Sequence, residues 1–192
     1  MKKYHYTYGH KIESIIMTGL KCSPKGTSRK NKDGKWYNHI GAREKPIIWF
    51  SSNPQFEMTA RKPRYKFDEY RNLTTTDVSL VDDVKEIGLF RFVVPSYLNE
   101  TIKPWILLRP EAGIALIDFN RINKAGKALG GNPIEWFGLV MEEEWSLCVH
   151  DFKLQYLDEN MKWHDCSQEE GIAIAKSKPM ANVNSLNLGS LV

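Results

Sequence analysis

A histidine and a threonine stand two positions apart near the start of the chain, in KKYHYTY. Alternate side chains of a strand point to opposite faces. Tyr4, Tyr6 and Tyr8 therefore share one face of a predicted strand, and His5 and Thr7 share the other. We expect the tyrosines to pack inside, and the imidazole and the hydroxyl to face a ligand. The alternative is that His5 is an ordinary strand histidine whose hydrogen bonds are satisfied within the protein.

Hydroxyl groups, aromatic rings and a carboxylate occur in two later apolar segments. The segment PIIWFSSNP begins and ends with a proline, and its apolar residues predict a buried strand that carries Trp49, Ser51 and Ser52. IEWFGLVM predicts another strand, which begins at Glu135. By default, serines at the end of a strand cap the following turn, and Glu135 is an exposed strand start. Glu57, in QFEMTARK, is expected on the surface of a short helix.

A metal site is an alternative to a site for an organic ligand. The tripeptides CVH and HDC form its clearest pattern, because each places a cysteine and a histidine on one face of a strand. The four ligands would be Cys148, His150, His164 and Cys166. A hairpin that turns near Asn160 would set His164 opposite Gln155 or Tyr156, several residues from Cys148. We therefore expect no zinc site.

These residues must be positioned by the elements around them. HKIESIIMTGL has apolar residues at helical spacing and ends at Gly19, and residues 115–129 predict a second helix. GLFRFVVP, WSLCVHDFKLQYL and MKWHDC predict further strands, whereas PWILLRPEAG is expected to be irregular. Together these elements predict one α+β domain over residues 1–178. Residues 179–192 form a tail that docks as an edge or stays loosely ordered.

The bulk composition restricts the class of protein. A chain of 192 residues with 42% hydrophobic and 26% charged residues is typical of a single globular domain. No apolar run reaches the roughly 18 residues of a membrane span, and no apolar stretch of a signal peptide follows the first lysines. Three widely spaced cysteines favour a reducing compartment. We expect a cytoplasmic protein without a membrane partner.

Positive charge is concentrated in two parts of the chain. Residues 21–45 contain eight lysines and arginines against two acidic residues. The second cluster consists of Arg61, Lys62, Arg64, Lys66 and Arg71. Such clusters attract phosphates of a nucleotide or a polynucleotide, and Trp36 and Tyr37 would stack on bases. The alternative is a solvated loop.

The order of three motifs resembles one family. The motifs are YHYT before a helix that ends in TGL, then WFSS, then IEWFGLV. This order resembles the ADP-ribosyltransferases with a histidine on the first strand, which include diphtheria-toxin-like and poly-ADP-ribose polymerase-like enzymes. It is also similar to small bacterial and phage proteins with YHYT and WFS motifs. The resemblance implies an ADP-ribosyltransferase-like fold with split mixed or antiparallel sheets, few short helices, and NAD as substrate.

The resemblance also implies roles for individual residues. His5, with Thr7 nearby, would hydrogen-bond the ribose or the adenosine part of NAD. Ser51 would shape the nicotinamide pocket, with Trp49 and Ser52 beside it. Tyr6 stands where the family usually has glycine.

The same resemblance implies that Glu135 is the catalytic carboxylate, which contacts the ribose 2′-OH. The alternative location of this carboxylate is the acidic run Glu142, Glu143 and Glu144. Arg91 or the basic loop would bind the pyrophosphate.

These roles suit cleavage of the nicotinamide–ribose bond, because the sugar passes through an oxocarbenium-like state that a carboxylate stabilises. The expected activity is transfer of ADP-ribose from NAD to an unknown protein or nucleic-acid acceptor, or NAD hydrolysis, as in a toxin-like enzyme. The alternative is a nucleic-acid-binding or phosphate-handling module that shares the fold without NAD turnover, with nucleic acid bound by residues 21–45.

Overall fold

The computed structural model describes residues 1–22, 28–30, 36–38, 45–62, 64–67, 73–76, 78–141 and 145–180. Its α-helices are α1 (Gly9–Thr18), α2 (Leu80–Glu86), α3 (Trp105–Glu111), α4 (Leu116–Ala128) and α5 (Gln168–Ser177). Three short 3-10 helices are η1 (Met58–Ala60), η2 (Ser96–Leu98) and η3 (Pro133–Glu135). Within the described ranges, no helix is long and apolar enough to span a membrane.

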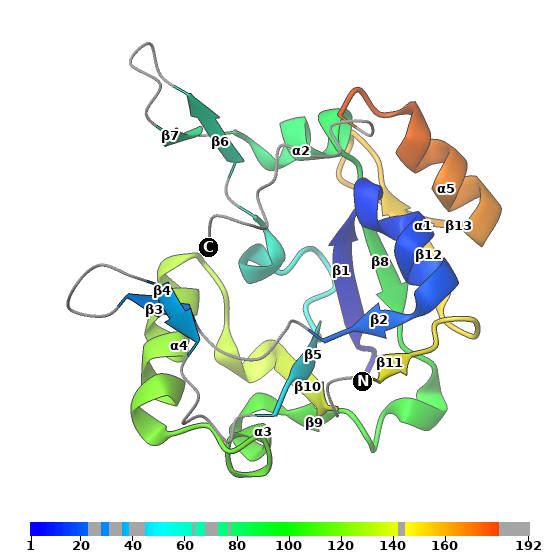
Figure 1. Cartoon of the computed structure of the whole chain (residues 1–192). Coiled ribbons are helices and arrows are strands. Elements are labelled where there is room, and N and C mark those ends of the chain that lie inside the picture. Colours follow the sequence, from blue (N-terminus) through cyan, green and yellow to red (C-terminus); the bar gives the residue numbers. More distant parts are fainter. Residues whose placement is uncertain are drawn as a thin grey trace.

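One seven-stranded sheet forms the centre of the molecule (Figure 1). Its strands, in spatial order, are β13 (Trp163–Cys166), β12 (Lys153–Leu157), β8 (Leu89–Val93), β1 (Tyr4–Tyr8), β5 (Ile47–Ser51), β10 (Trp136–Val140) and β9 (Lys103–Pro104). Every neighbouring pair in it runs antiparallel. The predicted α+β class is therefore confirmed.

Among the residues that the structure describes, three two-stranded pairs lie outside this sheet. They are β2 (Leu20–Lys21) with β11 (Ser146–Leu147), β3 (Ser28–Lys30) with β4 (Trp36–Asn38), and β6 (Arg64–Phe67) with β7 (Leu73–Thr76). Figure 1 shows the β6–β7 hairpin standing away from the central sheet.

Both faces of the sheet are covered. On one face, α1 and α5 lie side by side (Figure 1) and contribute Ile12 and Ala175 to a core with Phe90 and Phe92 of β8. On the other face, Tyr4, Tyr6 and Tyr8 pack with Phe56, Val84, Leu89 and Leu157. The tyrosines are all buried, as the alternation in KKYHYTY predicts. Trp105 of α3 and Trp136 of β10 belong to a third cluster on the β5–β10 half of the sheet.

The pairing of β1 with β5 is much shorter than that of its neighbours. β1 pairs with β8 over five residues, and β10 pairs with β5 over five residues. Between β1 and β5 only Tyr4 and Ser51 are in register. The two strands therefore diverge beyond this pair, in the middle of the sheet.

Several elements differ from the sequence-based predictions. Residues 105–111, expected to be irregular, form α3 with Pro110 inside its last turn. QFEMTARK contains a single 3-10 turn rather than a short helix. The WSLCVHDFKLQYL segment contains two strands, β11 and β12, separated by a turn around Phe152. The predicted helix over residues 115–129 is confirmed as α4.

Candidate functional site

Asn53 connects three neighbouring strands of the sheet. Its backbone N–H donates to Ser51 Oγ (3.1 Å) at the end of β5, and its side-chain Nδ2 donates to Glu135 Oε2 (3.2 Å) just before β10. Its carbonyl oxygen accepts a hydrogen bond from the hydroxyl of Tyr6 on β1. One residue that was predicted only as part of a turn therefore holds a hydroxyl and a carboxylate in place.

Glu57 is buried, so its predicted place on a helix surface is wrong. The residue is 5% exposed. Its Oε2 accepts from Ser51 Oγ (2.9 Å), and its Oε1 accepts from Thr59 Oγ1 (2.8 Å) and from the Thr59 N–H (3.3 Å). A buried carboxylate needs such donors to offset its lost hydration. Two carboxylates, Glu57 and Glu135, are thus linked through Ser51 and Asn53.

Three successive backbone carbonyls in the turn after β5 are held by side chains of three different strands. The Asn53 carbonyl accepts from Tyr6 of β1, and the Pro54 carbonyl accepts from Arg91 Nη1 of β8. The Gln55 carbonyl accepts from Trp163 Nε1 of β13 (2.6 Å). These contacts fix the turn on the sheet and explain why a tyrosine at position 6 is useful here.

Arg91 lies inside the protein between two aromatic rings. Its Cζ is 4.2 Å from the ring centroid of Tyr4 and 4.2 Å from that of Trp163, which stabilises a buried guanidinium. Its Nε donates to Gln155 Oε1 (2.6 Å), and only 7% of the residue is exposed. We therefore assign Arg91 to the support of the turn rather than to a bound pyrophosphate.

His5 lies where β1 leaves β5. Its Nδ1 is 2.8 Å from the carbonyl oxygen of Trp49. A carbonyl oxygen only accepts, so Nδ1 carries the hydrogen and the neutral ring keeps an acceptor at Nε2. Burial lowers the pKa of His5, and the bond to Trp49 offsets part of that shift. Among the described residues Nε2 has no hydrogen-bond partner, so it is free to accept from a ligand hydroxyl.

Trp49 presents an aromatic ring to solvent. It is 39% exposed, and its ring centroid lies 4.9 Å from that of Trp105. Trp105 stacks on Phe119 (4.8 Å between centroids), and its Nε1 donates to Asn123 Oδ1 (2.6 Å). The exposed ring is therefore backed by a fixed aromatic stack, as a platform for a planar group requires.

The structure brings together some of the predicted site residues and separates others. Ser51, Ser52 and Glu135 are neighbours, because the Ser52 N–H donates to the Glu135 carbonyl (2.8 Å). His5 leaves β1 on the face opposite to Ser51, and its ring contacts Phe50. Thr7 is opposite Phe90, further along β1, and makes no hydrogen bond with this group.

The competing glutamates at positions 142–144 lie outside the described residues, as does most of the basic segment 21–45. The strand register sets His164 opposite Tyr156 and Cys166 opposite Leu154. No group of three or more metal-ligating side chains occurs in the part of the chain that the structure describes. The three cysteines are unpaired.

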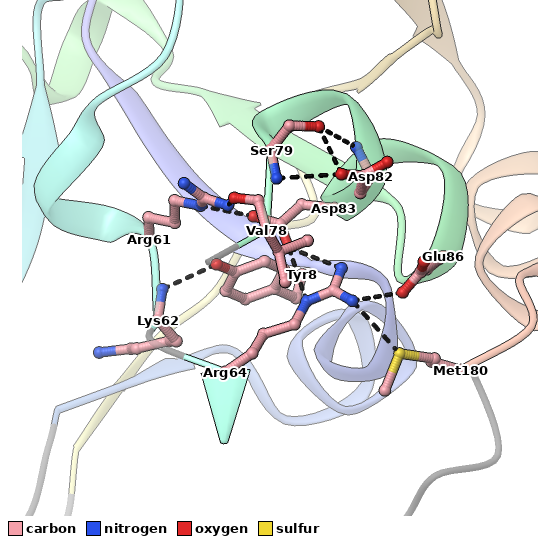
Figure 2. Close-up of polar contacts among 10 residues, drawn as sticks. All are labelled: Tyr8, Arg61, Lys62, Arg64, Val78, Ser79, Asp82, Asp83, Glu86 and Met180. Atoms are coloured by element: carbon pink, nitrogen blue, oxygen red, sulfur yellow. Dashed lines mark hydrogen bonds and ion pairs between the residues drawn. The ribbon is translucent and has the colours of Figure 1, made fainter. Parts of the chain in front are cut away.

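Two arginines of the second basic cluster are already neutralised (Figure 2). Arg61 Nε lies 2.6 Å from Asp83 Oδ2, and Arg64 Nη2 lies 2.6 Å from Asp83 Oδ1. Arg64 also pairs with Glu86 through Nη1, and Asp83 is 1% exposed. These guanidiniums attach the segment after η1 to α2, so they are poorly placed to bind a polynucleotide.

Comparison with protein-family models, with curated proteins and with solved structures found no match for this chain.

Proposed function

We propose that the protein cleaves the nicotinamide–ribose bond of NAD and transfers ADP-ribose to an acceptor, or to water. The observation that supports this most is the group formed by Glu135, Asn53 and Ser51 at the adjoining ends of β5 and β10. It lies beside the point where β1, carrying His5, diverges from β5.

Each residue has a part in the proposed reaction. The carbon–nitrogen bond breaks toward nicotinamide, which takes both electrons and leaves neutral, so no general acid is required. Glu135 stabilises the positive charge that develops on the ribose and holds its 2′-OH. His5 Nε2 accepts from a ribose hydroxyl, and Trp49 stacks on a planar ring of the substrate. The acceptor, or water, then forms a bond to the sugar carbon and loses its proton to the solvent.

The first experiment is nicotinamide release from NAD by the purified chain, with and without cell extract as a source of acceptors. We expect Glu135→Gln to lower the rate at least about 100-fold, because it removes the charge that acts in the transition state. Glu159→Gln is the matched control, since Glu159 is an exposed glutamate with only one long ion pair (3.9 Å to Lys85).

The outcomes separate the possible carboxylates. Release that survives in Glu135→Gln but is lost in Glu57→Gln or Glu142→Gln would assign the role to another glutamate. Absence of release, together with no thermal stabilisation of the protein by NAD, would refute the proposal.

A further inference from the structure

The indole N–H of Trp136 is a buried donor without an acceptor. Within the described part of the chain, three buried side-chain atoms lack a hydrogen bond: Arg64 Nη2, Asn99 Oδ1 and Trp136 Nε1. Arg64 Nη2 nevertheless has an ion-pair partner, because it lies 2.6 Å from Asp83 Oδ1. Asn99 Oδ1 is an acceptor, so Trp136 Nε1 is the donor of interest. Trp136 is 5% exposed, so its N–H is an uncharged donor that is shielded from bulk solvent and has no acceptor among the described residues. Such groups are rare and cost about 1–3 kcal/mol.

The carboxylate of Glu57 lies near the same indole. A carboxylate accepts about four hydrogen bonds, and Glu57 receives three, from Ser51 Oγ, Thr59 Oγ1 and Thr59 N. Trp136 is directly opposite Ser51 in the sheet, so the indole and the Ser51–Glu57 pair share a face. A Cβ at Gly131 would lie 2.5 Å from Thr59 Cγ2, 2.8 Å from Glu57 Oε1 and 3.0 Å from Trp136 Cζ2. The carboxylate and the indole ring therefore both lie against Gly131.

We infer that Glu57 and Trp136 Nε1 bind the amide or amidine edge of a ligand, a planar group with an acceptor next to an NH₂ donor. The ligand's acceptor receives the indole hydrogen, and its NH₂ donates to the carboxylate. Both the carboxamide of nicotinamide and the N1–N6 edge of adenine have this pattern. The inference rests on the proposed function only in taking NAD, which carries both groups, as the source.

Access to this pair is through the turn after α4. Gly131 contributes no side chain between Glu57 and Trp136, and Gly130 has φ +84° and only Met58 near its missing Cβ. A ligand edge enters when this turn shifts. A side chain at position 131 would collide with Thr59, Glu57 and Trp136, so only glycine lets this turn lie against the pair.

The test is an NMR titration of the tryptophan side chains in the full chain. The six tryptophans give six indole N–H signals, and the spectrum of Trp136→Phe identifies the one from Trp136. Free nicotinamide and free adenosine are added separately, up to about 10 mM, since fragments of this size bind in the millimolar range. We expect a saturable downfield shift of the Trp136 signal with one of them, which names the source. Nicotinic acid or inosine should not produce it, because one lacks the NH₂ donor and the other reverses the pattern.

Two variants complete the test. Glu57→Gln should reduce the preference for nicotinamide over nicotinic acid, or for adenosine over inosine, at least about 10-fold, because the negative charge is gone. Trp145→Phe is the control, since Trp145 is 68% exposed and takes no part in the proposed site. In Trp145→Phe the shift of the Trp136 signal should persist.

A Trp136 signal that stays unmoved by both probes would overturn the inference, even if the protein releases nicotinamide from NAD. A preference for nicotinamide over nicotinic acid, or for adenosine over inosine, that is unchanged in Glu57→Gln would also overturn it. Conversely, a specific shift with a protein that releases no nicotinamide would leave the inference standing and refute the proposed activity.

Discussion

At the scale of single residues, the site depends on groups whose partners fix their protonation or direction. His5 shows this most clearly, because the Trp49 carbonyl selects the tautomer that leaves an acceptor at Nε2. Asn53 does the same for Glu135, to which its amide donates. The sequence motifs predict His5, Ser51 and Glu135 as site residues, whereas Asn53 reads only as a turn residue and Glu57 as a surface glutamate. Both follow β5 in a turn, and only the fold shows that this turn bends back onto the sheet.

The lowered pKa of His5 makes stability depend on pH. An unfolded histidine takes up a proton near pH 6.5, whereas the folded ring resists it. Stability should therefore fall as pH drops through about 6.5 toward the folded pKa, by at most about 1.4 kcal/mol per pH unit. Urea unfolding of His5→Gln between pH 7.5 and 5 should show a smaller slope. His150→Gln, at an exposed position, is the control, and an equal slope in wild type and His5→Gln would contradict the prediction. The remaining slope is expected from His10, whose pKa burial also lowers.

At the scale of elements, the sequence contains start signals for two helices that its apolar pattern does not predict. α2 and α5 both begin with a capping box, Ser79 with Asp82 and Ser167 with Glu170, which is a start signal readable from sequence. Neither helix was predicted, because the apolar spacing that follows is short. α3 was missed because two prolines, at positions 104 and 110, suggest an irregular segment. The prolines are tolerated because one precedes the helix and the other lies in its last turn.

Asp83 should be the most costly carboxylate of α2 to remove. Asp83→Ala leaves Arg61 and Arg64 without their shared buried partner (Figure 2), and we expect a loss of about 3 kcal/mol in the free energy of unfolding. Asp82→Ala, one residue earlier, removes only the capping contacts with Ser79 and should cost less. Urea denaturation of both variants measures the difference. Equal losses would show that the ion pairs of Asp83 contribute little.

At the scale of the whole molecule, the order of strands was beyond the sequence argument. β1 pairs with β8 and β5, which are distant in the chain, and local periodicity carries no information about such pairing. By contrast, Phe90 and Phe92 lie in one core cluster and Leu89 in another, which the alternation in GLFRFVVP indicates, because alternation is a local property. The predicted boundary at residue 179 is untested, since residues 181–192 are outside the described ranges.

The three thiols report on the integrity of the fold. Cys148 is exposed, whereas Cys22 and Cys166 are partly buried. Burial, with Glu170 and Asp165 nearby, raises the pKa of Cys166 to about 11, and burial also raises that of Cys22. At pH 8 a disulfide reagent should label Cys148 first and Cys166 at least about 100-fold more slowly, because the thiolate is the reactive form. Cys148→Ser should remove the fast phase, and equal rates for all three thiols in native protein would contradict the structure.

The turn held by Tyr6, Arg91 and Trp163 also limits how this protein can diverge. All three contacts go to backbone carbonyls, at positions 53, 54 and 55. Backbone acceptors survive a change of side chain but not a change of chain length, so one inserted or deleted residue would misalign all three. Gln55 is thus free to vary, while the number of residues from Ser51 to Glu57 is fixed. A search for distant relatives should therefore use that spacing, a serine followed by asparagine at the second position and glutamate at the sixth, rather than overall identity.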